Sequence, residues 1–171
     1  VLIATAVRTG ALGGDAARSE GGTPRSARSL WAGVLIAFGV VVMGALVAKT
    51  PGAAAACPAF PHCGLVDGTV ANGRNIQIGH RVLAFLLALH LLGVTTAIRR
   101  RAGESDTVKR GAGTLIVLVI VQVALGAAMV MSSLAPALRI AHQATGVGVW
   151  LAVFLVYDLA RRAASATAVA A

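Results

Sequence analysis

Three of the four histidines in this chain, His80, His90 and His142, lie inside long apolar runs of the sequence. Ionisable side chains are costly within a membrane, so residues of this kind are candidates for function. If the runs are helices, His80 and His142 each lie about four to five residues from a helix start, at a depth of roughly 6 to 8 Å. These two helices would run in the same direction, and as neighbours they would turn their imidazoles toward each other. Such a pair can hold a heme iron from both faces, the alternative being two unrelated interfacial histidines.

Other polar residues accompany this histidine pair. His90 follows His80 by ten residues, which places it about 15 Å deeper and rotated by about 80°. We therefore interpret it as a hydrogen-bonded packing residue. Gln77 precedes His80 by one turn and is predicted to orient its imidazole or to contact the cofactor. Arg81 and Arg139 are predicted to pair with heme propionates, because guanidinium matches carboxylate geometry, or else to extend to lipid headgroups.

The only two cysteines, Cys57 and Cys63, enclose the short loop CPAFPHC. Outside the cytoplasm a cysteine pair usually forms a disulfide, and the restricted backbone of Pro58 and Pro61 suits bridging. A metal site using His62 is an alternative, but zinc and copper usually need a fourth ligand. A dithiol relay usually has a shorter spacing. A structural disulfide is favoured, with His62 facing solvent.

The composition requires a membrane to position these residues. Of 171 residues, 57% are hydrophobic and only 12% are charged, about half the charged fraction of a soluble domain. Backbone groups in lipid must bond within their own segment, so long apolar runs should be helices. The predicted fold is an all-α polytopic membrane four-helix bundle with spans near 30–48, 76–98, 111–131 and 137–160.

The basic residues are distributed unevenly between the two ends of these spans. Eleven of the fifteen lie before the first span, between the second and third, or after the fourth. The positive-inside rule then places both termini in the cytoplasm and the Cys57–Cys63 loop outside. Although the net charge is +9, aromatic residues make up only 4% and no helix has a basic face. Nucleic acid is therefore excluded as a partner.

The first residues, VLIATAV, are apolar and lack the basic region that precedes the core of a signal peptide. We interpret them as the end of an earlier membrane helix, and the chain as a fragment. The predicted organisation is a helix remnant at 1–7, a cytoplasmic linker at 8–29, a transmembrane heme-binding half at 30–161 and a cytoplasmic tail at 162–171.

Five blocks of the sequence resemble the heme A synthase family. They are GALVAKT, CPAFPHC, IQIGHR, QVALGAAMV and LRIAHQ, and they cover about Gly44 to Trp150. The cysteine loop with the following GHR is the most specific part. The family is expected to convert heme O to heme A for the terminal oxidase, and its bacterial members have two four-helix halves.

The resemblance implies that this chain is the second half, which binds heme b. Gln77 occupies the position of a glutamate in the half that carries the chemistry, and the cysteine spacing is also that of the second half. His80 and His142 are then the axial ligands of heme b, Cys57–Cys63 is the disulfide of that half, and no catalytic residue is expected here. The expected role is to accept or relay electrons in a bacterial plasma membrane.

Several partners and two other functions accompany this interpretation. The implied partners are membrane lipid, heme O and heme A, heme O synthase or oxidase assembly proteins, and a second copy of the chain. The alternatives are a stand-alone four-helix b-type electron-transfer cytochrome and a heme-free membrane scaffold.

Overall fold

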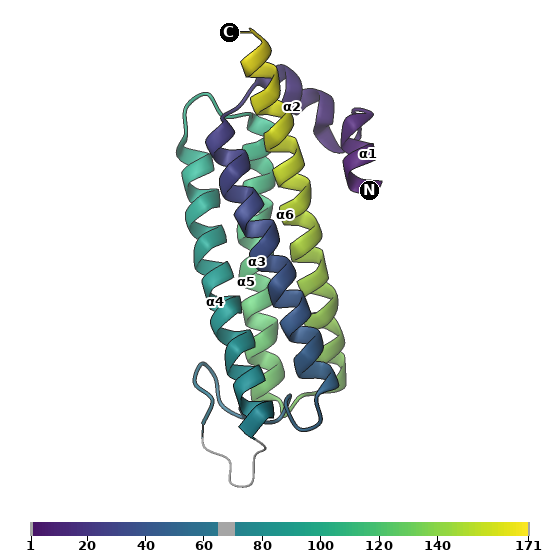
Figure 1. The fold of residues 1–171 in the computed structure, drawn as a ribbon, viewed down its shortest axis with the longest axis vertical. Coiled ribbons are helices and arrows are strands. Elements are labelled where there is room, and N and C mark those ends of the chain that lie inside the picture. The colour runs from purple at the N-terminus through teal and green to yellow at the C-terminus, as the bar shows by residue number, and fades with distance from the viewer. Residues whose placement is uncertain (1, 65–70, 171) are drawn as a thin grey trace.

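The computed structural model describes residues 2–64 and 71–170, and four long helices dominate it (Figure 1). The long helices are α3 (Pro24–Lys49), α4 (Ala71–Arg100), α5 (Asp106–Met131) and α6 (Pro136–Ala170). Before them lie α1 (Leu2–Arg8), the 3-10 turn η1 (Ala11–Gly13) and α2 (Gly14–Glu20). The described residues contain no strand, which confirms the predicted all-α class.

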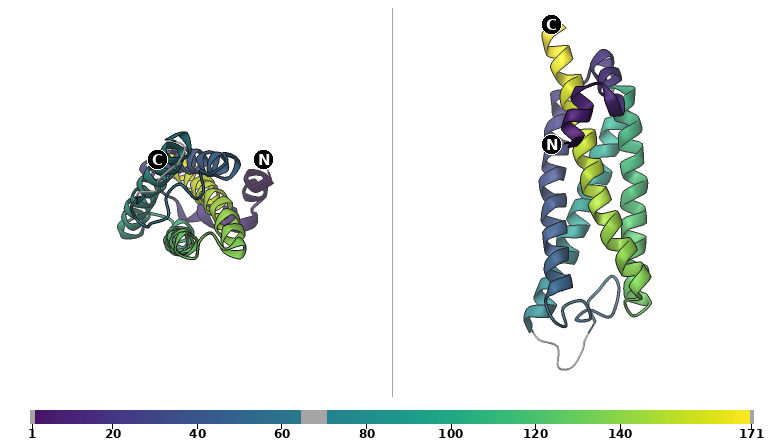
Figure 2. Two further views of the ribbon diagram at one scale, coloured as in Figure 1. Left: turned by 90° about the horizontal axis from the view of Figure 1, so that it is seen from below. Right: turned by 90° about the vertical axis from the view of Figure 1, so that its right-hand side faces the viewer.

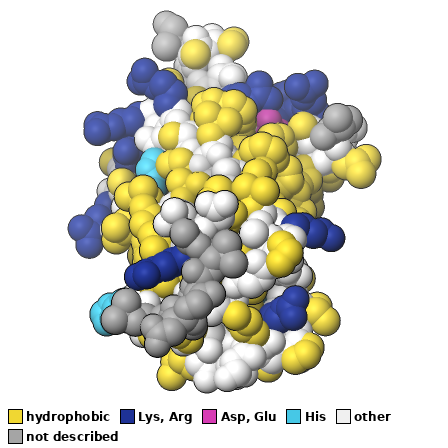
Figure 3. Space-filling view, turned by 60° about the horizontal axis from the view of Figure 1, so that its bottom comes forward, with side chains coloured by type: hydrophobic (Ala, Val, Ile, Leu, Met, Phe, Trp, Pro, Cys, Tyr) yellow, Lys and Arg dark blue, Asp and Glu magenta, His cyan; other side chains and the backbone are white. Residues whose placement is uncertain are grey.

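All four long helices are long and apolar enough to cross a membrane. Only 17–22% of each apolar window is buried inside the protein, so most of these side chains face outward. Hydrophobic side chains cover the flank of the bundle in Figure 3. Large exposed examples come from every long helix: Leu35, Leu86, Leu89, Ile120 and Leu151. Such an exterior is stable in lipid, which confirms a multi-pass membrane protein.

The four long helices form a closed ring in which α3 packs against α4 and α6, and α5 packs against the same two helices. The end-on view in Figure 2 shows α4 and α6 on opposite sides of this ring. From the sequence, we expected the imidazoles of His80 and His142 to face each other if their helices were neighbours. Instead the two helices lie diagonally across the bundle, so an inward-pointing side chain of one faces an inward-pointing side chain of the other.

The buried hydrophobic core occupies one half of the bundle's length. Its members run from four boundary residues toward the end of the bundle that carries both chain termini. Each boundary residue lies seven positions, or about 10 Å, from a glycine or histidine nearer the cysteine loop. These pairs are Ala37 and Gly44 on α3, Leu87 and His80 on α4, Val119 and Gly126 on α5, and Val149 and His142 on α6.

The helices extend beyond their predicted limits at the end with the termini. The predicted linker 8–29 contains α2 and the first turn of α3, which begins at Pro24. Proline is favoured in the first helical turn because its φ is already suitable. The predicted tail 162–171 continues α6 to Ala170, since alanine is a strong helix former and α1 and α2 pack against α6.

A buried carboxylate fastens the start of α3 to the turn between α4 and α5. Glu104 is only 4% exposed and accepts hydrogen bonds from the Thr23 hydroxyl at 2.9 Å and from the Ser26 hydroxyl. Arg101 lies 3.7 Å from the same carboxylate and also donates to Ser26. This group of four residues, which we call the Glu104 cluster, has its charge and hydrogen bonds satisfied within the protein.

Candidate functional site

A cavity lies between the four long helices at the end that carries the cysteine loop. It consists of two adjoining hollows of about 380 Å³ and about 120 Å³. His80 from α4 and His142 from α6 line both of them, together with Gln77 from α4 and Gln122 from α5. The structure therefore brings the two histidines, predicted from their matched depths, to one shared space.

Each of these histidines packs against a glycine of the preceding helix. A Cβ atom added to Gly44 on α3 would lie 3.2 Å from Cε1 of His80, and one added to Gly126 on α5 would lie 3.1 Å from Cε1 of His142. Both distances are tighter than ordinary carbon contacts, so a larger residue would displace the imidazole. The same glycine–histidine arrangement thus occurs in the α3–α4 and α5–α6 pairs.

Gln122 is the site residue that sequence reasoning missed. Its amide Nε2 lies 3.2 Å from Nδ1 of His142 and 3.1 Å from the His142 carbonyl oxygen. A contact of this kind fixes the orientation of an imidazole ring. The signal was present in the sequence, because Gln122 is a lone polar residue in an apolar run, one turn before Gly126.

Several buried polar atoms around the cavity have no hydrogen-bond partner among the described residues. They are Oε1 of Gln77, Nδ1 of His80 and Oε1 of Gln122. Gln77 itself is only 4% exposed. Because an unpaired buried polar group costs about 1–3 kcal/mol, its presence beside a cavity indicates a place for a ligand.

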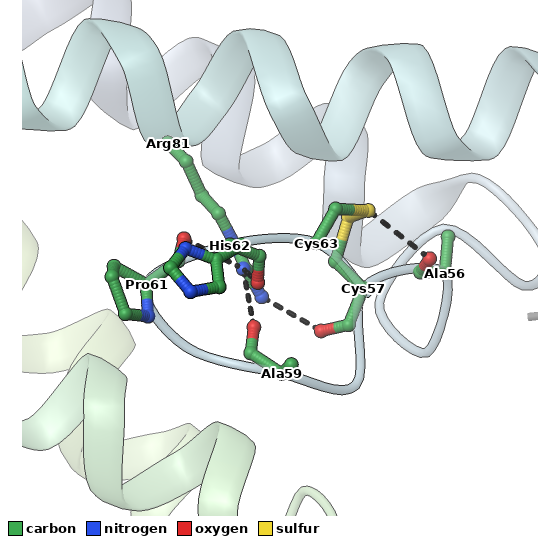
Figure 4. The surroundings of a disulfide bond; sticks show 7 residues. All are labelled: Ala56, Cys57, Ala59, Pro61, His62, Cys63 and Arg81. Atoms are coloured by element: carbon green, nitrogen blue, oxygen red, sulfur yellow. Dashed lines mark hydrogen bonds between the residues drawn. A yellow bond between two sulfur atoms is a disulfide. The ribbon is translucent and has the colours of Figure 1, made fainter. Parts of the chain in front are cut away.

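The cysteine loop is fastened to α4 by Arg81, the residue that follows His80. Cys57 and Cys63 form a disulfide, as we had expected. The Arg81 guanidinium donates to the carbonyl oxygens of Cys57, Ala59 and His62 at 2.6–2.7 Å (Figure 4). Arg81 thus uses both terminal nitrogens on the loop and holds it next to the cavity.

One side chain of this loop reaches the cavity directly. Phe60 lines the smaller hollow, and its ring centre lies 6.1 Å from that of Phe85 on α4. The apolar loop tip therefore forms part of the wall of the smaller hollow.

The remaining predicted residues lie at or beyond the edge of the cavity. Arg139 is exposed and lines the larger hollow at the start of α6, where its side chain has no ion pair among the described residues. His90 lines neither hollow, and its Nε2 lies 3.0 Å from the Ser29 carbonyl oxygen, in line with a packing role. His62 is exposed in the loop.

The residues present fit a heme better than a bare metal ion. Within residues 2–64 and 71–170, no three His, Cys, Asp or Glu side chains gather as a metal site. Two imidazoles facing one apolar cavity lack the third and fourth ligands that zinc needs. Heme brings four nitrogen ligands of its own and needs the protein to supply only axial ligands. The space left by Gly44 and Gly126 further suits imidazoles that act as such ligands.

The fold and the site define a polytopic membrane protein with a paired-histidine cavity. Residues 1–154 match the COX15-CtaA family, whose description is cytochrome oxidase assembly protein, and the chain belongs to this family. The match confirms the resemblance to heme A synthases, and it implies a role in cytochrome oxidase assembly and heme A synthesis, of the oxidoreductase class. Neither the curated proteins nor the solved structures gave a match to this chain.

Proposed function

We propose that this chain forms a heme b-binding half of a membrane oxidoreductase that converts heme O to heme A. In this proposal His80 and His142 would hold the heme iron, which would let this half accept or relay electrons. The observation that carries the proposal is that both histidines line the same apolar cavity from diagonally opposite helices. Family membership supports the reaction class.

The cavity residues have separate tasks in this proposal. Heme b, when bound, supplies an iron that takes up and releases a single electron. Gly44 and Gly126 leave room for the two imidazole rings. Gln122 holds the His142 ring in one orientation, and Gln77 offers a buried amide on the same side as His80.

The two arginines at this end are assigned different tasks. Arg139 lines the larger hollow from the rim and is proposed to pair with a heme propionate, since carboxylate matches its guanidinium. The donors of Arg81 at Nη1 and Nη2 already bond the cysteine loop. Its contribution to a propionate is therefore proposed to come second to holding the loop against the cavity.

Among the described residues, the cavity lining holds no carboxylate for acid or base catalysis of a methyl oxidation, and its two imidazoles are assigned to the heme. No Asp or Glu is among the described residues that line either hollow, and Gln77 cannot exchange a proton at neutral pH. We therefore assign the oxidation of heme O to a second cavity, in another half or another subunit. The same observation favours the second candidate function, a stand-alone b-type electron-transfer cytochrome.

The orientation in the membrane is part of the proposal. Both termini and the turn at 101–105 lie at one end of the bundle, and the cysteine loop lies at the other (Figure 1). With most basic residues at the former end, the positive-inside rule favours placing it in the cytoplasm of a bacterium and the disulfide outside.

The ligand assignment is tested with His80→Ala and His142→Ala. Each variant should insert into the membrane and lose bound heme, because insertion depends on apolar area rather than on one imidazole. The measurement is the heme-to-protein ratio of purified protein, with its reduced absorbance spectrum. His90→Ala is the matched control and should keep its heme. Full heme content in His142→Ala would refute the assignment.

A second experiment tests whether heme O is oxidised in this cavity or in another one. The chain is purified from cells that also make heme O, and its bound hemes are extracted. Chromatography should find heme b in the chain and no heme A formed by it alone. If the isolated chain converts heme O to heme A, the oxidation takes place in this cavity and our assignment is wrong. Stimulation of heme A formation by adding the chain to a separate catalytic half would exclude the stand-alone cytochrome.

A further inference from the structure

Four arginines from three helices surround a second hollow, at the end of the bundle opposite to the histidine cavity. Arg8 on α1, Arg18 on α2, and Arg161 and Arg162 on α6 line a space of about 620 Å³, together with Ser165 and Val169. We call this space the arginine pocket. The proposed heme function does not use this pocket.

The nearby carboxylates do not cancel the charge of the arginine pocket. Asp158 accepts a hydrogen bond from Arg161 at 2.7 Å and lies 3.9 Å from Nε of Arg162. Asp15 on α2 lies against Gly10 and is not part of the lining. One buried carboxylate therefore pairs with two of the four arginines, and the pocket keeps a net positive charge.

Arg162 indicates that this pocket holds a ligand. Its side chain is only 10% exposed, and its Nε and Nη1 atoms are buried without a hydrogen-bond partner among the described residues. Its one ionic partner, Asp158 Oδ2, lies 3.9 Å from Nε, which is too long for a hydrogen bond and leaves the guanidinium poorly paired. Because arginine forms paired hydrogen bonds with phosphate oxygens, a phosphate group in the hollow would pair with the guanidinium groups that line it.

The position of the arginine pocket along α6 indicates where such a phosphate comes from. The apolar run of α6 ends at Ala160, and Arg161 and Arg162 follow it directly. A helix crosses the hydrocarbon region in about 20 residues, so the run from Ala137 to Ala160 brings both arginines to the level of the lipid headgroups.

We propose that the arginine pocket binds the phosphate group of an anionic phospholipid. The shared chemistry is a phosphate oxygen anion paired with arginine, and the headgroup depth of the pocket favours a lipid over a soluble phosphate. Bound lipid of this kind would join α1 and α2 to the end of α6.

The test counts bound lipids on the detergent-solubilised full chain by native mass spectrometry. Phosphatidylglycerol, phosphatidylcholine and inorganic phosphate are titrated separately. The Arg8→Gln/Arg18→Gln variant should bind phosphatidylglycerol about 25-fold more weakly, because each basic residue at an anionic surface contributes about fivefold. Arg8 and Arg18 are exposed, so the fold should persist, as circular dichroism would check.

The matched control is Arg25→Gln/Arg28→Gln, which removes two exposed arginines at the same end but outside the pocket. It should bind phosphatidylglycerol as tightly as the unaltered chain. Equal weakening in both double variants would show an effect of overall charge and overturn the proposal. Equal affinity for phosphatidylcholine and phosphatidylglycerol in the unaltered chain, with no binding of inorganic phosphate, would overturn it too. Displacement of phosphatidylglycerol by millimolar inorganic phosphate would overturn the lipid assignment, because the pocket would then be a site for soluble phosphate.

Discussion

Glu104 and Gln77 are equally buried, each 4% exposed, but they lie at opposite ends of the bundle and are paired differently. The Glu104 carboxylate accepts hydrogen bonds from Thr23 and Ser26 and borders no hollow that we describe. The Gln77 amide oxygen has no partner among the described residues and borders the histidine cavity. The comparison shows that two equally buried polar groups can differ in pairing, and the unpaired one beside a hollow is the better candidate for a site residue.

The two ends of the bundle also differ in packing, because one is filled by side chains and the other contains a cavity. Buried leucine, isoleucine and valine side chains fill the half that contains the Glu104 cluster. Toward the cysteine loop, the level of His80 and His142 is bordered by Gly44 and Gly126. One end therefore contributes mainly to stability, and the other keeps space open. If this division is correct, substitutions at the two ends should change different measurements.

The largest expected effect follows from filling the cavity with Gly126→Leu. The new side chain would occupy the position of the His142 imidazole, since even a Cβ atom lies 3.1 Å from that ring. We expect heme content to fall close to zero while helicity and insertion persist. Gly148→Leu on α6 is the control, because nothing lies within 4 Å of an added Cβ there. Normal heme content in Gly126→Leu would show that the cavity is not the heme site.

Removing the buried carboxylate with Glu104→Ala should lower stability and leave heme binding unchanged, the reverse of the result expected for Gly126→Leu. The variant leaves Arg101 and the hydroxyls of Thr23 and Ser26 without their acceptor, which should lower the free energy of unfolding by about 3 kcal/mol. Its heme affinity should not change. Unfolding in mixed micelles measures the first quantity and heme titration the second. Lys109→Ala, which breaks an exposed ion pair, should cost less than about 0.5 kcal/mol.

Arg81 tests the comparison at the end with the cysteine loop, because its guanidinium is hydrogen-bonded although it lies beside the cavity. Arg81→Gln removes the donors that hold the carbonyl oxygens of the loop, and it should lower the free energy of unfolding by about 2 kcal/mol. Cys57→Ser should also lower thermal stability, without changing the heme spectrum. Arg74→Gln, on the same helix, is the control for charge alone. Complete loss of heme in Arg81→Gln with normal stability would contradict the assignment of Arg81 to the loop.

The smallest expected effect concerns the orientation of one ligand. Gln122→Leu removes the amide next to His142 Nδ1 and should weaken heme binding by about tenfold, with a shift in reduction potential. The free energy of unfolding should change little. Gln143→Leu is the control, because Gln143 lines the larger hollow but is exposed. An unchanged affinity and potential in Gln122→Leu would remove Gln122 from the site.

Much of the fold could be predicted from the sequence, and the histidine pair with it. Four spans follow from run length, since only a helix satisfies its backbone in lipid. The matched depth of His80 and His142 follows from counting residues along two parallel helices. The diagonal placement of those helices could not be predicted, because hydrophobic periodicity gives no ring order when most of each helix surface faces lipid. The contact between Gln122 and His142 depends on that order and was missed for the same reason.

The sequence alone determined that this protein is a multi-helix membrane protein with two histidines at one level and most basic residues at one end. Those properties depend on composition and on distance along the chain, which are fixed before folding. Tertiary structure decided which glycine lies behind each histidine, that Arg81 holds the cysteine loop, and that arginines from α1, α2 and α6 form one pocket. These contacts join residues far apart in the chain, so they depend on how the helices pack against one another.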